Sequence, residues 1–482
     1  MKSQVIDSGG FFDDGATPSP HRSAALRRAA VSVDGIWGVP SPSLPSCNFG
    51  TLAGSPRHPR HRILDPVQGA RVRNIVKGVA MAGTVISLYL LFFAPEMVRG
   101  CYAYSWLFAF YFYLTLALGG CFWTLLHNVT NSGWGTSVRR TYENLGSTYP
   151  WMFLFGLPLL CPKVQQYLYE WMNIERAATG VVSDYLHHAN HLLYDKYWFL
   201  NVPFWYGRVI CWGLGLSLVI IGLRQLSVSQ DTDPHPGTAR LLKARFHSTY
   251  TLILFAVTLT FTGYDFMLGL DYKWFSTMWG VYIFAGSALN SLAVVVLVCT
   301  WLKSQGHLQH VTSAEHFHIM GKLMLAFTVF WAYIGFSQYF LIWYAGVTEE
   351  TSYFLIRNTG NWNLTMLALV FGHFVLPFVF LLQAWLKRNP RYLALIAGYT
   401  LCMHVLDHYA IAIPERGISL GNIKPEVFGD IQVSIPWAWT GDVFAFVTIG
   451  AAFLFFLLRA LGQHSLYPNR DPRILESANC SN

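Results

Sequence analysis

The chemistry of this chain starts from titratable side chains that lie inside long apolar segments. His404, Asp407 and His408 lie three and four residues apart, which places them on one face of a helix. His373 lies four residues before Pro377, and a proline cannot donate a hydrogen bond to the carbonyl oxygen of His373. A carboxylate beside an imidazole can orient it or exchange a proton with it. This pattern predicts proton transfer, with histidines that are merely satisfied inside a packed core as the alternative.

A second set of polar residues lies in one apolar segment, residues 316–350. Lys322 is the first to explain, because an ionisable group at membrane depth costs a few kcal/mol. With about 100° of rotation per residue, five polar positions of this segment fall on one side of a helix. These positions are His318, Lys322, Tyr333, Ser337 and Tyr344. We expect this stripe to face protein or water rather than lipid, with Asp407 able to neutralise Lys322. A stripe that only pairs helices is the alternative.

Further titratable groups lie near the boundaries of the apolar segments. His127 precedes two arginines, and Asp265 precedes an apolar run that should desolvate its carboxylate. Glu349 and Glu350 follow the Lys322 segment, with Arg357 as a candidate ion-pair partner. Together, such groups can carry protons across a bilayer when hydroxyls and waters bridge the gaps. The candidate proton route consists of His127, Asp265, His318, Lys322, Tyr333, Ser337, Glu349, Glu350, His373, His404 and Asp407.

Membrane-spanning helices must hold these residues. Of the 482 residues, 53% are hydrophobic and only 12% are charged, which excludes a soluble globular composition. A membrane-spanning helix needs about 20 apolar residues, and runs of this length predict an all-α polytopic membrane protein with about ten helices. The runs lie near 76–97, 104–127, 150–168, 203–225, 247–270, 277–302, 316–345, 362–386, 391–413 and 437–461.

Basic residues gather at alternate ends of these segments. Because cytoplasmic loops carry the excess of lysine and arginine, both termini are predicted to be cytoplasmic. The net charge of +8 is therefore a topology signal and does not indicate nucleic-acid binding. Residues 1–70, rich in Ser, Pro, Gly, Arg and His, are predicted to be a disordered cytoplasmic extension. Residues 71–465 form the transmembrane domain, and residues 466–482 a cytoplasmic tail.

The sequence predicts no metal bound by this chain. Its eight cysteines show no paired spacing, which argues against an iron–sulfur cluster or a structural zinc. His187, His188 and His191 form an HHxxH pattern in the connection 169–202. No cysteine or carboxylate joins them at standard ligand spacing, so a polar, partner-facing helix is preferred to a metal site. Phosphate-binding loops and nucleophile motifs do not occur, so soluble-type hydrolysis and ATP chemistry are not indicated.

Four segments carry a resemblance to a known family. They read LLHNVTNSGWGTSVRR, GYDFMLGLDYKWFSTMWGVYIFAGS, GKLMLAFTVFWAYIGFSQYFLIWYAGVTEE and GHFVLPFVFLL. Over roughly residues 70–465 the chain resembles the ActF subunits of bacterial alternative complex III, a quinol:cytochrome c or quinol:electron-acceptor oxidoreductase. These subunits are similar to the wider NrfD and polysulfide-reductase membrane-subunit family.

The resemblance implies a ten-helix fold with two four-helix bundles plus two further helices, in the bacterial inner membrane. It implies that this chain carries no haem or metal and is not catalytic alone. The implied partners are a sister membrane subunit ActC, an iron–sulfur subunit ActB, haem c subunits ActA and ActE, and a small subunit ActD. Electrons from quinol would pass through these partners. This subunit would form part of the membrane sector of the complex and contribute a proton route. Whether it binds quinol is left open.

Two functions of other classes stay open. In a haem b-type membrane electron carrier, His127, His318, His373 and His404 would ligate haem between helices. In an ion-coupled secondary transporter, charged groups at the midplane would bind the substrate or the coupling ion. The inverted repeats and paired broken helices typical of such transporters are not evident in the sequence.

Overall fold

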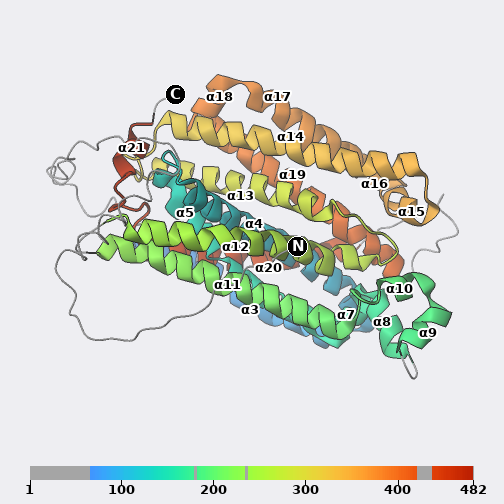
Figure 1. The fold of residues 1–482 in the computed structure, drawn as a ribbon. Coiled ribbons are helices and arrows are strands. Elements are labelled where there is room, and N and C mark those ends of the chain that lie inside the picture. Colours follow the sequence, from blue (N-terminus) through green and yellow to red (C-terminus); the bar gives the residue numbers. More distant parts are fainter. Residues whose placement is uncertain (1–65, 179–181, 234–236, 421–436, 481–482) are drawn as a thin grey trace, which may run out of the picture. The chain divides into compact units, whose positions relative to one another are not determined.

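The computed structural model describes residues 66–178, 182–233, 237–420 and 437–480 (Figure 1). They belong to one compact unit, Pro59–Asn482. Helices and short turns make up this described part, which contains no strand. Residues 1–65 of the predicted extension lie outside the described residues. The first described helix begins at Pro66, within the range predicted as extension.

The first half of the chain forms helices of very different length. The long helices are α3 (Pro66–Phe92), α4 (Glu96–Thr130), α11 (Val202–Thr232) and α12 (Ala239–Phe266). Between α4 and α11 lie α5 (Thr136–Gly146), α6 (Tyr149–Phe155), η3 (Leu157–Leu160), α7 (Pro162–Leu168), α8 (Glu170–Ala177), α9 (Val182–Ala189) and α10 (His191–Lys196). The predicted single helix at 150–168 is therefore wrong. Pro158 and Pro162 lack the N–H that a continuous helix needs there.

The second half begins with η4 (Leu268–Leu270), α13 (Trp279–Ser304), α14 (Ala314–Ala345) and α15 (Thr348–Arg357). One further segment combines α16 (Asn361–Ala368), the π-helix η5 (Leu369–Val375) and α17 (Leu376–Leu382). It is followed by α18 (Ala384–Arg388), α19 (Pro390–Ser419), α20 (Ala438–Gln463) and α21 (Ile474–Ala478).

Eight segments of the described chain are long and apolar enough to cross a membrane: α3, α4, α11, α12 with η4, α13, α14, α16 to α17, and α20. They confirm the prediction of an all-helical, multi-pass membrane protein. The 30-residue α19 is not one of the eight. It carries several buried charged and polar side chains, including His404, Asp407 and Glu415.

Helix α4 is the most enclosed of the long helices. It packs against α3, α5, α12, α13, α19 and α20, and nearly all of its side chains from Gly100 to Leu125 are buried. Glycine allows its closest approach to α13. A Cβ atom at Gly119 would lie 2.2 Å from the carbonyl oxygen of Ser287. Small residues at such crossings let helix backbones pack directly against each other.

Gly119→Ala is expected to destabilise the protein by about 1–3 kcal/mol, because the added methyl group would push α4 away from α13. A fall in the unfolding midpoint of the detergent-solubilised protein would measure this loss. Gly215→Ala on α11 is the matched control, since a Cβ there meets nothing within 4 Å. The control should be unchanged or slightly more stable, because alanine has the higher helix propensity. Equal losses in both variants would contradict close packing at Gly119.

Several long helices begin or end together at one end of the described unit (Figure 1, left). We call it the basic end, because these helix ends carry Arg224, Arg240, Lys243, Lys303 and Arg459. Here α11, α13 and α20 end while α12 and α14 begin. The predicted tail is packed against this end: α21 contacts α5, and Ser477 Oγ lies 2.7 Å from Ser137 Oγ. Asp471 forms an ion pair of 3.0 Å with Arg139. That the basic end faces the cytoplasm stays a prediction.

Candidate proton-transfer site

Asp407 lies at the centre of a buried polar cluster formed by several helices. The hydroxyl of Tyr282 donates to its Oδ1 at 2.5 Å, and the indole Nε1 of Trp331 donates to its Oδ2 at 3.3 Å. His404 Nδ1 lies 3.6 Å from the same Oδ2. The carboxyl group is 3% exposed. Asp407 is therefore held by groups from α13, α14 and α19, shielded from outside.

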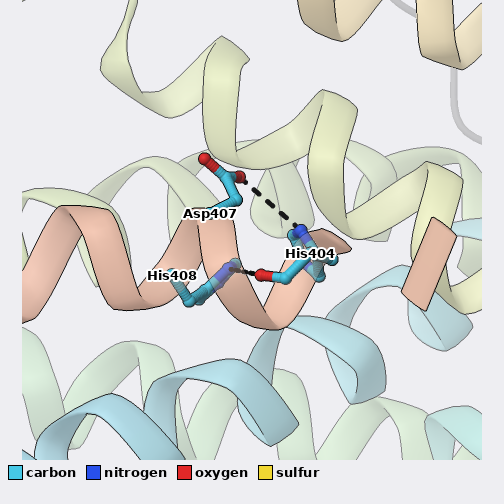
Figure 2. Close-up of side chains that lie close together, drawn as sticks. All are labelled: His404, Asp407 and His408. Carbon is cyan, nitrogen blue, oxygen red and sulfur yellow. Dashed lines mark hydrogen bonds and ion pairs between the residues drawn. The ribbon is translucent and has the colours of Figure 1, made fainter. Parts of the chain in front are cut away.

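The two histidines of α19 pack against each other beside Asp407 (Figure 2). The ring centroids of His404 and His408 are 4.2 Å apart. His408 Nδ1 lies 3.3 Å from the carbonyl oxygen of His404, and since a carbonyl only accepts, this nitrogen carries the proton. His408 Nε2 lies 3.3 Å from the hydroxyl oxygen of Thr115 on α4. The spacing read from the sequence thus places all three side chains in one site.

His373 enters the same site from another segment. It lies in the π-helix η5, about one turn before Pro377, and π-helical turns are frequent at functional sites. Its ring lies 4.2 Å from the ring of Trp331 and 6.0 Å from that of His404, centroid to centroid. We call His373, His404, Asp407, His408 and Tyr282 the His–Asp cluster.

The cluster contains buried nitrogen atoms whose hydrogen bonds are not made. Neither ring nitrogen of His373 and neither ring nitrogen of His404 has a hydrogen-bond partner within the described residues. Leaving one such group unsatisfied costs about 1–3 kcal/mol. Buried groups of this kind are normally satisfied by ordered water or a ligand, or they have a catalytic role. The cluster can therefore accept and pass protons among groups that already lie close together.

A metal ion fits the same residues less well. One ligand atom from each of His404, Asp407 and His408 lies within 4.8 Å of the others. In a tetrahedral zinc site, ligand atoms at about 2.0–2.1 Å from the metal are about 3.4 Å apart. The three side chains would have to close in around an ion, and Asp407 would have to give up contacts that now hold it. Proton exchange needs a smaller movement, which brings His404 Nδ1 and Asp407 Oδ2 from 3.6 Å to hydrogen-bond distance.

The polar stripe of α14 lies mainly on the outer face of the described chain. Lys322, Tyr333 and Tyr344 are exposed, while His318 and Ser337 are partly buried. The opposite face of α14 packs into the protein through Met320, Met324, Thr328, Trp331, Gln338 and Ile342. Tyrosine is common at membrane interfaces and lysine can extend its charge to water, so polar residues do not by themselves mark a buried face. That the stripe faces protein or water rather than lipid stays a prediction, and within the described chain it does not face the other helices.

Lys322 is also far from Asp407. Asp407 contacts Trp331, which lies nine residues further along α14, or about 13 Å along the axis. The neighbour of Lys322 is instead Lys387 of α18. Burial first, and then the charge of Lys322, lower the pKa of the Lys387 ammonium. The prediction that Asp407 neutralises Lys322 is wrong, and Lys322 is explained by its position near the basic end.

His127 and Asp265 lie apart from the His–Asp cluster. His127 Nδ1 bonds to the carbonyl oxygen of Trp123 at 2.7 Å, and its Nε2 has no partner within the described residues. Asp265 is buried against Arg208, with an ion pair of 2.5 Å, and also accepts from Trp212 Nε1 at 3.3 Å. The structure therefore gives Asp265 a partner that the sequence did not indicate.

Arg357 has a partner other than Glu350, the described acidic residue after α14. Arg357 forms an ion pair of 3.0 Å with Glu415 of α19, so the proposed pairing with Glu350 is wrong. Arg357 Nε also donates to the carbonyl oxygen of Ala410 at 3.0 Å, which Pro414 leaves without its helical donor. Glu350 is partly buried, and the side chain of Glu349 lies outside the described residues.

Sequence reasoning missed most partners of the buried charges. Tyr282 and Trp331 lie within predicted apolar segments, 277–302 and 316–345, and Glu415 lies beyond the predicted segment 391–413. A second missed ion pair joins Arg416 to Asp442 at 2.7 Å, and Ser105 donates to Asp442 at 2.5 Å. Pro414 was the one available sign of a buried partner. A proline inside a helix leaves the carbonyl oxygen four residues before it, here that of Ala410, without its helical donor.

The other histidines predicted as ligands lie in separate places. His127 stacks near Trp134, with ring centroids 5.2 Å apart, and His318 lies 3.2 Å from Glu315. A haem carrier would need His127, His318, His373 and His404 as ligands. Among these four, His373 and His404 are the pair whose rings are in contact. In the HHxxH segment, exposed His191 pairs with exposed Asp195 at 3.3 Å. The side chain of His188 lies outside the described residues.

No protein-family model matches this chain, and no curated protein matches it. Its function therefore has to be argued from what the buried site can do.

Proposed function

We propose that this chain is an integral membrane subunit of a quinol:electron-acceptor (cytochrome c) oxidoreductase, and that its His–Asp cluster is part of a proton route. The observation that supports this proposal is a buried carboxyl group beside imidazoles whose nitrogen atoms lack protein partners, on helices of a membrane protein. Ionisable groups inside such helices are costly and usually functional. Quinol oxidation releases protons, so a redox complex gives such a cluster a task.

Further buried atoms without hydrogen-bond partners lie on both sides of the cluster. Tyr111 lies beside His408, with ring centroids 5.7 Å apart, and its hydroxyl group has no partner within the described residues. On the way to the basic end, the same holds for Asn290 Oδ1, Tyr142 OH and His127 Nε2. Waters that bridge such atoms would extend the route through the bundle.

The redox groups in this proposal belong to other subunits. Haem c subunits of the ActA and ActE type and an iron–sulfur subunit of the ActB type would carry the electrons, with ActC-like and ActD-like subunits in the membrane part. The two four-helix bundles, the cytoplasmic termini, the bacterial inner-membrane location and quinol binding are further parts of the proposal. Contacts among α13, α14, the α16 to α17 segment and α19 are compatible with one of the two bundles.

Co-purification tests the assembly. The full-length chain, tagged at its N-terminus and solubilised in a mild detergent, is expected to bring down a multihaem c-type cytochrome and an iron–sulfur protein, identified by mass spectrometry and visible spectra. Recovery of the chain alone would contradict the proposal and favour the transporter. A reduced b-type haem band in the isolated chain would favour the haem carrier.

A further inference from the structure

We propose that a groove between α6, α11 and α20 at the basic end binds one anionic glycerophospholipid, with its phosphate against Arg224 and Arg459. The groove has a cavity volume of about 780 Å³. It shares no residue with the His–Asp cluster. The proposal is therefore independent of the proposed function.

The walls of the groove are apolar and open towards the membrane. Leu214, Leu218 and Ile221 follow one face of α11 at helical spacing, and all three are largely exposed. Opposite them, Trp151 of α6 stacks on Phe456 of α20, with ring centroids 4.3 Å apart and planes 9° from parallel. These side chains offer an acyl chain a continuous apolar surface.

The polar end of the groove carries two arginines that form no ion pair with a described residue, although the charge of Glu143 acts on Arg224. Arg224 bonds to Asn144 and donates to the carbonyl oxygen of Ala460 at 3.2 Å, and it forms no ion pair within the described residues. Arg459 is exposed and makes neither a hydrogen bond nor an ion pair with a described residue. None of the described lining residues is acidic. A phosphate group would supply the missing negative charge and accept from both guanidinium groups.

His464 lies at the same end of the groove, close to positively charged side chains. Burial first, and then the positive charges of Arg224 and Arg140, lower the pKa of this histidine. Two guanidinium groups therefore act on this end of the groove, although Arg140 itself pairs with Glu143 and Asp231. Positive groups that gather at one end of a groove attract anions.

The depth of the two arginines matches a lipid headgroup. Arg224 lies eight residues before the end of α11 and Arg459 four residues before the end of α20, or about 12 Å and about 6 Å from these helix ends. In helices of this length, both guanidinium groups can reach the boundary of a hydrocarbon core about 30 Å thick. Basic pockets between helices at this level bind anionic lipid headgroups.

A quinol is the less suitable occupant of this groove. Quinol oxidation needs a group that takes up protons, and the described lining residues offer one histidine and no carboxylate. A quinol is uncharged, so it would leave the positive charges of the two arginines without a negative partner. The chemistry of the groove favours a charged phosphodiester.

Lipid selectivity tests the proposal. The purified full-length protein is reconstituted in phosphatidylcholine nanodiscs, and spin-labelled phosphatidylglycerol or phosphatidylcholine reports the motion-restricted lipid. We expect phosphatidylglycerol to bind several-fold more tightly. Arg459→Gln should weaken it by about fivefold, because a basic residue near the surface contributes about 1 kcal/mol to anionic-lipid binding. Arg224→Lys, which keeps the charge, should bind more tightly than Arg224→Gln.

Lys243→Gln is the matched control, because Lys243 is an exposed basic residue of α12 outside the groove. It should leave lipid selectivity unchanged. Equal binding of both lipids, or equal losses in Lys243→Gln and Arg459→Gln, would overturn the proposal. Displacement of the labelled lipid by inorganic phosphate alone would show a free-anion site, and displacement by a quinone analogue a quinone site. Since Arg459 is exposed, its variant should keep its helical content.

Discussion

Asp407→Asn is expected to lower quinol-driven proton translocation by at least about tenfold, while the complex still assembles. Asparagine keeps the size of the side chain, and its amide oxygen can still accept from Tyr282, which now donates to Asp407 Oδ1. The weaker contact from Trp331 at 3.3 Å is lost, because an amide NH2 group takes the place of Oδ2. It cannot take up and release a proton. Proton release by the purified complex in proteoliposomes, followed with a pH-sensitive dye after addition of quinol, measures the effect.

Asp195→Asn is the matched control for this experiment. It makes the same change at an exposed carboxylate of α10, on the surface of the protein, and should leave translocation unaltered. Tyr282→Phe should give an intermediate loss, since it removes the hydroxyl that donates to Asp407 and keeps the ring. If Asp407→Asn pumps as well as the control, the cluster has a structural role and the proton route lies elsewhere.

Arg208→Met is expected to destabilise the protein by about 3–5 kcal/mol. Methionine fills most of the same space but leaves the Asp265 carboxylate buried without its cation. The pair is almost completely enclosed, with 6% and 0% of the two side chains exposed. Arg208 also covers the face of Phe199, 3.8 Å from the ring centroid, so cation–π contacts are lost as well. Thermal unfolding of the detergent-solubilised protein measures the fall in stability.

Two comparisons separate charge burial from packing. Arg240→Met breaks a more exposed ion pair with Asp233, with 38% and 25% of the side chains exposed, and should cost less than about 1 kcal/mol. The double variant Arg208→Met, Asp265→Leu removes both buried charges and should recover part of the stability lost by Arg208→Met alone. If the double variant is no more stable than Arg208→Met, the uncompensated carboxylate is not the cause.

Local spacing predicted the part of the site that lies on one helix. The positions of His404, Asp407 and His408 sufficed to put three polar side chains on one face of α19. Their partners come from distant parts of the chain: Tyr282 is 125 residues from Asp407, and Trp331 is 76 residues away. A single sequence contains no physical signal for which aromatic residue of another helix will face a given carboxyl group.

The long apolar helices were predictable because hydrophobic length is a local property, whereas the orientation of a helix about its own axis is not. In α14 the exposed face carries Lys322 and Tyr333 and the buried face carries Thr328 and Gln338. Both faces are mostly apolar, so periodicity gave little contrast between lipid and protein. Arg208 and Asp265 were obscured for the same reason, since each looked like an isolated charge near a helix end.

The packing of α21 on α5 has a consequence for how this protein is made. Ser477 lies 2.7 Å from Ser137 and 3.3 Å from His316, and Asp471 pairs with Arg139. Membrane insertion proceeds as the chain emerges from the ribosome, so Arg139 and His316 are synthesised before Asp471 and Ser477. The basic end can therefore reach its final packing only after residues 471–477 have emerged and folded back over helices that were made earlier.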